Sequence, residues 1–268
     1  MIWWKTVLLV VQRELQARRK AALIITGVLI TLAVGVVILV SATAGDGPPR
    51  RLEPSEADEL MGFIGVIIMF TAILMTGQVL LLGVAEEKNS RVAEVVLGAM
   101  RPRLLLLGKV IAIGLIGLFE VLLTGALVLI VGNALDAVEL PAATNGAFAI
   151  VVMWFLLGFG FYATVYAAAG SLVARHQNAA NAAGPINIVV MIGYFIGVTS
   201  AGSQVNANPF LRAASLTPPL APTTMPLRMI QGTAEVWEIV VSISLLVVSA
   251  YLMILLAERV YSGGLLSS

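Results

Sequence analysis

The chain contains no cysteine, a single histidine and few charged residues. The absence of cysteine excludes disulfides and thiol chemistry. His176 lies beside Arg175 without cysteine, histidine or acidic residues at metal-binding spacing, so we expect no metal site. The motifs HExxH and Gly-x-Ser-x-Gly are missing, and Gly108-Lys109 lacks the earlier glycine of a phosphate-binding loop. We therefore expect a non-catalytic chain that binds no cofactor of its own.

The composition is typical of a membrane protein. Only 12% of the 268 residues are charged and 59% are hydrophobic, whereas soluble domains carry about 25% charged residues. The mean hydropathy is +0.99. The formal net charge of +1 argues against a nucleic-acid partner. These values predict a polytopic membrane protein embedded in the lipid bilayer.

Six windows of the sequence are nearly free of charge and long enough to cross a bilayer, which takes about 20 residues. One uninterrupted example is Leu60–Ala85, which ends at the charged run that begins at Glu86. We place the membrane cores near residues 22–42, 61–84, 107–131, 147–172, 184–200 and 239–257. The predicted fold is all-α, with six transmembrane helices in a single domain over residues 1–268.

The distribution of lysine and arginine predicts the orientation. If the N-terminus is inside, the inner segments hold twelve of these residues and the outer segments hold four. Positive residues gather on the cytoplasmic side of membrane proteins. Both termini are therefore predicted to be cytoplasmic, in a multi-pass protein of the cell (inner or plasma) membrane.

Residues 3–20 have an amphipathic pattern at helical spacing. The apolar positions are Trp3, Trp4, Val7, Leu8, Val11 and Leu15. The polar positions are Lys5, Arg13, Glu14, Arg18, Arg19 and Lys20. This pattern predicts a helix in the membrane interface. A flanking segment that sets the orientation of the first span is a compatible and equally favoured interpretation.

The outer segment 201–237 is long and interrupted by Pro209, Pro218, Pro219, Pro222 and Pro226. Apolar sequence broken by proline favours short re-entrant or surface helices before the last span. In the preceding span, Gly193 and Gly197 form a GxxxG motif that permits a close helix–helix contact. That motif is either a dimerisation site or a chance match in a chain with 25 glycines.

The inner segment 86–103 is predicted to contain a short amphipathic helix, which Pro102 ends. Glu87, Arg91 and Glu94 are spaced to pair along one side of it. An apolar stripe on another side consists of Val92, Val95, Val96 and Ala99. Such a helix packs on the chain's own helices or docks in a groove of another protein, and periodicity alone favours self-packing.

Glu120 is the one carboxylate inside a predicted span. Ionisable groups in the membrane are costly and face a polar interior or cavity. One interpretation is a proton or cation site, or a polar group that lines a substrate path. The other is a protonated acid that is hydrogen-bonded to a neighbour such as Thr124, Tyr162 or Tyr166.

Two stretches carry a resemblance to a known family. The first is Glu86-Glu87-Lys88-Asn89-Ser90-Arg91-Val92-Ala93-Glu94-Val95-Val96-Leu97, followed by Arg101-Pro102-Arg103-Leu104-Leu105-Leu106-Leu107-Gly108-Lys109. The second comprises Pro222, Met225-Pro226, Trp237-Glu238, Ala257-Glu258-Arg259-Val260-Tyr261 and Gly264-Leu265. With these motifs, the chain resembles the type-2 export permeases of ATP-binding-cassette (ABC) transporters, above all the group named for sodium-efflux permeases.

The resemblance implies a permease that pairs with a second copy or a homologue and with two copies of a separate ATPase subunit, which would hold ATP and magnesium. Residues 3–20 and a coupling helix at 86–100 would contact that ATPase. For residues 86–100, the resemblance therefore favours docking on a partner over packing on the chain's own helices. The implied contact residues are Glu87, Arg91, Val92, Glu94, Val95, Val96 and Ala99. The implied activity is efflux of an ion, drug or lipid-like substrate. A large outer insertion found in many sodium-efflux relatives is missing, since the first outer loop is only Thr43–Glu59.

Two other functions stay open at this point. One is an ATP-independent channel or secondary transporter that uses Glu120 on its substrate path. The other is a membrane scaffold or assembly factor. Dependence on ATP and on a partner ATPase distinguishes them from the ABC exporter.

Overall fold

The computed structural model describes residues 2–44, 54–89, 102–134, 144–173, 179–200 and 209–265. Within these ranges every regular element is a helix and there is no strand. The prediction of an all-α fold is therefore confirmed. Of the predicted coupling helix at 86–100, only the first turn falls within the described residues, as the C-terminal end of a longer helix.

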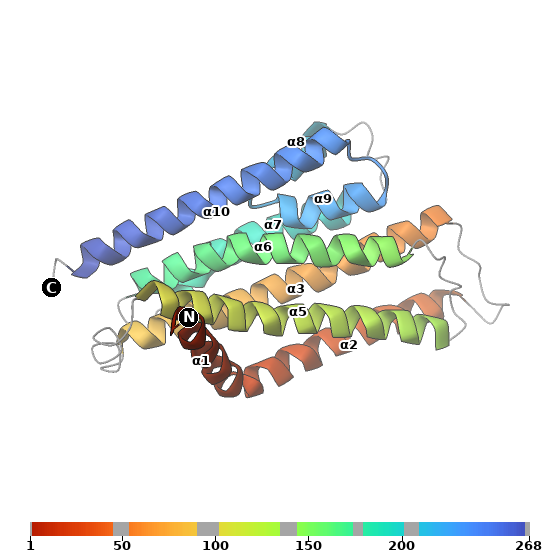
Figure 1. The fold of residues 1–268 in the computed structure, drawn as a ribbon. Coiled ribbons are helices and arrows are strands. Elements are labelled where there is room, and N and C mark those ends of the chain that lie inside the picture. The colour runs from red at the N-terminus through yellow and green to blue at the C-terminus, as the bar shows by residue number, and fades with distance from the viewer. Residues whose placement is uncertain are drawn as a thin grey trace.

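Six long helices lie side by side and alternate in direction along the chain (Figure 1). They are α2 (Arg19–Ala44), α3 (Pro54–Asn89), α5 (Pro102–Ala134), α6 (Thr144–Leu172), α7 (Ala179–Ser200) and α10 (Val236–Leu265). In the described part of the chain, α3, α5, α6, α7 and α10 are long and apolar enough to span a membrane. The chain is thus a multi-pass membrane protein. In α2 the apolar stretch found is the shorter Ala22–Thr31, so the count of six spans stays a prediction.

Helix α3 lies at the centre of the bundle and contacts α2, α5, α6, α7 and α9. Its inward residues Met69, Ala72 and Ile73 are fully buried. By contrast, α7 and α10 expose large apolar side chains such as Phe195 and Val240. This arrangement fits a bundle whose outer helices face lipid, because apolar side chains need no cover in a bilayer.

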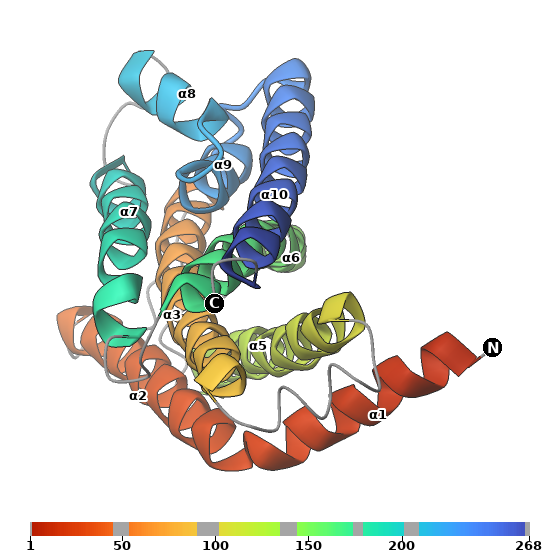
Figure 2. The same ribbon diagram turned by 90° about the vertical axis from the view of Figure 1, so that its left-hand side faces the viewer.

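Three shorter helices lie at the two ends of the bundle (Figure 1). Helix α1 (Ile2–Ala17) packs across α5 (Figure 2), at the end that we call the α1 end. Helices α8 (Pro209–Leu216) and α9 (Ala221–Ile230) lie at the opposite end, the α9 end. The proline-rich segment before the last span therefore does contain short helices; their position relative to a membrane stays a prediction.

Helix α9 is inserted among the long helices. Its residues Ala221–Arg228 are all buried, and it contacts α3, α6 and α7. Tyr162 of α6 donates its hydroxyl hydrogen bond to the carbonyl of Pro219 just before α9. The indole of Trp154 donates to the sulfur of Met229 at 3.0 Å. The α9 end of the bundle is thus filled by the chain itself.

The GxxxG motif of α7 provides a close contact within the chain. A Cβ atom at Gly193 would lie 2.5 Å from Thr223 Oγ1, and one at Gly197 would lie 3.0 Å from the carbonyl oxygen of Thr223. Both glycines therefore let α7 approach α9 closely. The face that the sequence offered as a dimerisation site is occupied by α9.

Candidate functional site

A group of buried charges joins α1, α3 and α5 at the α1 end. Lys109 of α5 is only 1% exposed. Its Nζ donates a hydrogen bond to the carbonyl oxygen of Gly83 on α3 at 2.7 Å and lies 3.7 Å from Glu14 Oε1 on α1. Glu14 is itself buried. One ammonium group therefore connects three helices that are distant in sequence.

Arg18, the residue between α1 and α2, extends this group toward α3. Its Nε lies 3.5 Å from Glu14 Oε2, and its Nη2 donates to Glu86 Oε2 at 3.3 Å. A Cβ atom at Gly83 would crowd the Lys109 Nζ at 3.2 Å, so the glycine leaves room for the cations. We call Glu14, Arg18, Gly83, Glu86 and Lys109 the three-helix junction.

The three-helix junction flanks the segment that the sequence analysis assigned to partner contact. Glu86 lies near the end of α3, and Lys109 lies about two turns into α5. Glu87 falls in α3, but its side chain is not described. The other predicted contact residues lie outside the described ranges: Arg91, Val92, Glu94, Val95, Val96 and Ala99. The junction therefore joins both helices that lead into and out of residues 90–101.

Sequence reasoning missed the pairing of Glu14 with Lys109. It assigned Glu14 to the polar face of the N-terminal helix and Leu8 to the apolar face; in the structure Glu14 is 5% exposed and Leu8 is 59% exposed. The helical spacing of the sequence contained a signal for this burial, because Glu14 lies about one turn after Val10 and Val11. In the structure both valines are buried against α5. An acidic residue in phase with that apolar stripe indicates a buried partner.

Glu120 is fully buried within α5. Among the described residues neither of its carboxyl oxygens has a hydrogen-bond partner, and the same holds for the buried hydroxyl of Thr124. Tyr166 donates to Asn187 Oδ1 at 2.7 Å, and Tyr162 donates to Pro219. The expected hydrogen bond from Glu120 to Thr124, Tyr162 or Tyr166 is therefore absent.

A second buried charge cluster lies at the α9 end and involves α8, α9 and α10. Arg228 donates to Ser215 Oγ at 2.6 Å, to Glu238 Oε2 at 2.6 Å and to the carbonyl of Thr233 at 3.0 Å. Glu238 Oε2 also accepts from the backbone N–H of Glu235 at 3.0 Å, as in a helix capping box. The carboxylate of Glu238 thus both caps α10 and compensates the buried guanidinium of Arg228.

Arg212 places a second cation on Glu238 from the half-exposed surface of α8. Ser242 of α10 donates to the carbonyl of Ser215 at 2.8 Å. These contacts pair the charged groups of the cluster with one another, so we interpret it as a structural connection between α8, α9 and α10. Sequence reasoning counted Arg228 only as an outer positive charge, because its acidic partner follows in another helix.

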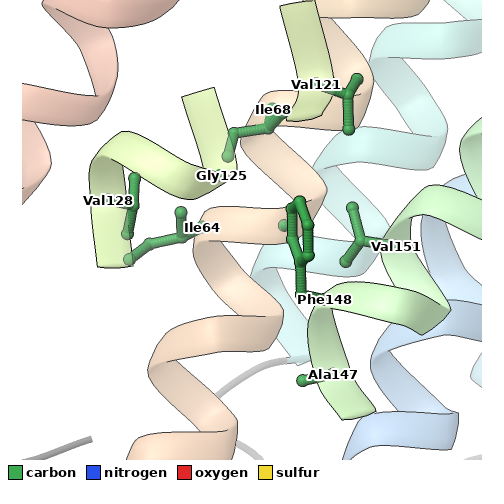
Figure 3. Close-up of a pocket in the computed structure, with 9 residues that line it drawn as sticks. Ile64, Ile68, Val121, Gly125, Val128, Ala147, Phe148 and Val151 are labelled. Carbon is green, nitrogen blue, oxygen red and sulfur yellow. The ribbon is translucent and has the colours of Figure 1, made fainter. Parts of the chain in front are cut away.

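A small apolar cavity lies between α3, α5 and α6 (Figure 3). Its volume is about 30 Å³, room for one water-sized group. The lining residues are Ile64, Gly65, Ile68, Val121, Gly125, Val128, Ala147, Phe148 and Val151. At Gly125 a Cβ atom would collide with the ring of Phe148, so the glycine is needed for this packing. In this conformation the cavity is too small for a drug-sized substrate.

Within the described ranges, no group of three or more histidine, cysteine or acidic residues could hold a metal ion. The buried charged groups that are described belong instead to the two clusters and to Glu120. Among the described residues, the three-helix junction and Glu120 are therefore the candidate functional groups.

Comparison with known proteins identifies relatives over most of the chain. The profile of a family described as "ABC-2 family transporter protein" matches residues 40–258. The chain is similar to the uncharacterized protein YhaP of Bacillus subtilis (strain 168), with 26% identity over 82% of this chain and 56% of YhaP. It is also similar to the uncharacterized protein MJ1024 of Methanocaldococcus jannaschii, with 27% identity over 75% of this chain and 48% of MJ1024. The chain spans about half the length of these curated relatives.

Proposed function

The chain belongs to the ABC-2 family of transporter proteins, and we propose that it is the membrane-spanning permease subunit of an ABC exporter. A separate ATPase subunit, present in two copies, binds ATP and magnesium and performs the hydrolysis. A second permease copy or a homologue completes the transporter. The chain itself is non-catalytic and lies in the cell membrane with both termini in the cytoplasm.

The observation that carries this proposal is the position of the three-helix junction. Residues 90–101 separate α3 from α5 in the sequence, and Glu86 and Lys109 on either side are joined through Arg18 and Glu14. A partner that pushes on this connection moves the ends of α3 and α5 together with α1. The junction thus makes three helices respond to one contact.

The partner contact is the coupling helix at 86–100. Its apolar residues Val92, Val95, Val96 and Ala99 fill a groove of the ATPase, and Glu87, Arg91 and Glu94 orient the helix at the rim. Pro102 begins α5 directly after it, where proline is favoured as a first helical residue. The movement of the coupling helix therefore passes directly to a long membrane helix.

The exported substrate is an ion, a drug or a lipid-like molecule, and Glu120 is the candidate residue on its path. The sequence motifs favour the sodium-efflux group within the family. The short loop before α3 makes this chain differ from relatives of that group that carry a large outer domain.

A second candidate function is an ATP-independent channel or secondary transporter. The burial of Glu120 without a hydrogen-bond partner among the described residues favours it, since such carboxylates mark ion and proton paths. The two functions differ in their dependence on ATP.

Reconstitution tests the choice. The chain is purified alone and together with a cassette ATPase from the same organism, and each preparation is placed in liposomes. We expect a stable complex in which the permease stimulates ATP hydrolysis above the rate of the ATPase alone. If the two proteins do not associate and transport by the chain alone needs no ATP, the exporter proposal is wrong.

A further inference from the structure

Helix α5 carries buried oxygen atoms within its membrane-spanning segment. Glu120 and Thr124 both lie within the span Leu106–Val128 of α5, and both are 0% exposed. Among the described residues, their three side-chain oxygens have no hydrogen-bond partner. Unsatisfied buried polar atoms are rare and call for a physical explanation.

A contact one turn away shows which helices lie near this part of α5. A Cβ atom at Gly117, about one turn before Glu120, would lie 2.8 Å from Thr76 Cγ2 of α3 and 2.8 Å from Phe155 Cζ of α6. Thr76 is fully buried and its hydroxyl donates a hydrogen bond to the carbonyl of Ala72. The Oγ1 atom of Thr76 can still accept a hydrogen bond. Glu120 also lies on nearly the same face of α5 as Lys109, about 16 Å farther along the helix. Lys109 and Glu120 therefore lie on one side of α5, with the apolar residues Ile113 and Ile116 between them.

The chemistry of these atoms restricts what can bind. A carboxylate offers two acceptor oxygens and a threonine hydroxyl offers one more, so the site can accept three hydrogen bonds. A primary ammonium has three N–H donors and a positive charge that compensates the carboxylate. Hard metal cations take about six to eight oxygen ligands, more than these residues supply.

The apolar surroundings restrict the rest of the ligand. Phe119 and Val121, which flank Glu120 in α5, are both apolar. A ligand that places an ammonium at Glu120 would therefore have apolar side chains beside it. This combination suits an amphiphile with a primary amine at one end.

We propose that Glu120 and Thr124 form the intramembrane binding site for the primary ammonium group of an amphiphilic molecule that the transporter exports. This inference rests on the proposed exporter function and names the chemical class of its substrate. A lone carboxylate at the bilayer centre costs about 2.5–3.5 kcal/mol, and a bound ammonium offsets that cost. The enclosed site opens when the three-helix junction shifts α5 against α3.

Binding of simple probes to the purified full chain in nanodiscs tests the proposal. The probes are hexylammonium, hexan-1-ol and hexyltrimethylammonium, which share the alkyl chain but differ in charge and in N–H donors. We expect only hexylammonium to raise the midpoint of thermal unfolding, in a concentration-dependent manner. Sodium and potassium chloride, compared at equal ionic strength with choline chloride, should give no shift.

Matched variants locate the site. Glu120→Gln keeps the shape of the side chain and should weaken hexylammonium binding at least about tenfold, as expected for loss of a charged hydrogen-bond partner. Thr124→Val should weaken it less, and Thr199→Val on α7 should leave it unchanged. If Glu120→Gln responds like the parent chain, or if hexan-1-ol gives the same shift as hexylammonium, the inference is wrong. A shift with sodium or potassium alone would also overturn it.

Binding of the ATPase separates this inference from the proposed function. Glu120 is remote from the coupling segment, so Glu120→Gln should associate with the ATPase like the parent chain. Normal association without hexylammonium binding would overturn only the inference. Hexylammonium binding without association would overturn the exporter function and, with it, the role of the amine as an exported substrate.

Discussion

Lys109 on α5 and Glu14 on α1 form a buried ion pair, with Nζ and Oε1 3.7 Å apart. Removal of one member of a buried pair leaves an uncompensated charge, which is far more costly than loss of a surface pair. This pair therefore holds α1 in place against the membrane helices. It also links α1 to the connection between α3 and α5.

The first prediction concerns this pair. Lys109→Met should destabilise the chain by about 3 kcal/mol, because Glu14 loses a buried cation and Gly83 loses a donor. Lys20→Met, at an exposed position, should change stability by no more than about 0.5 kcal/mol. Denaturant unfolding of the purified chain in detergent measures both.

A double variant checks the cause. Glu14→Gln combined with Lys109→Met removes both charges and should be more stable than Lys109→Met alone. With Glu14→Gln alone measured as well, additive effects of the two substitutions would show that the residues act independently.

The second prediction concerns the cluster at the α9 end. Arg228→Met should cost about 3 kcal/mol, since Glu238 stays buried while the buried one of its two cationic partners is lost. Hydrogen exchange of the α9 amides should rise, because Arg228 joins α9 to α8 and α10. Arg212→Gln serves as the control: its side chain is 48% exposed, so a loss of about 1 kcal/mol or less is expected. Equal effects of the two substitutions would contradict a special role for Arg228.

The helices were largely predictable from the sequence, whereas their polar contacts were not. Runs such as Leu60–Ala85 have only one stable form in a bilayer, because a helix satisfies its own backbone groups. The burial of α9 was different. Arg228 can enter the bundle only because Glu238, ten positions later, compensates its charge, and periodicity does not reveal that pairing.

Glu14 and the GxxxG motif illustrate the same limit. The sequence indicates that Gly193 permits a close contact, but the identity of the partner depends on the tertiary fold. The structure provides Thr223 of the same chain. In the same way, Glu14 was assigned from the sequence to the polar face of its helix. Only the tertiary fold shows that Lys109 lies beside it.

The third prediction concerns this glycine. Gly193→Ala should destabilise the chain by about 1–3 kcal/mol, because the added methyl would overlap Thr223 Oγ1. Thr223→Ala removes that atom and should partly rescue the variant. Gly184→Ala on the same helix is the control, since no atom lies within 4 Å of a Cβ there. Thermal unfolding measures all three; a dimer that dissociates in Gly193→Ala without loss of stability would favour the dimerisation interpretation.

The fourth prediction concerns topology. The chain lacks cysteine, so single cysteines at Ser55 and Ser90 can be labelled without background. An impermeant maleimide applied to intact cells should modify the cysteine at position 55 and leave the one at position 90 unmodified. Permeabilised cells provide the control, in which both should react. Labelling of position 90 from outside would reverse the predicted orientation.

The last prediction concerns the coupling helix, and it depends on how energy is distributed in interfaces. Apolar anchors that fill a pocket carry most of the binding energy, and charges at the rim carry less. Val95→Asp should therefore abolish pull-down of the ATPase and its stimulation in proteoliposomes, because a carboxylate would have to enter an apolar groove. Glu87→Ala should weaken association by only about 1 kcal/mol. Thermal unfolding of each variant provides the control for folding, since residue 95 should not affect the bundle if it faces the partner. If Val95→Asp binds and stimulates the ATPase like the parent chain, residues 86–100 do not couple ATP hydrolysis to transport.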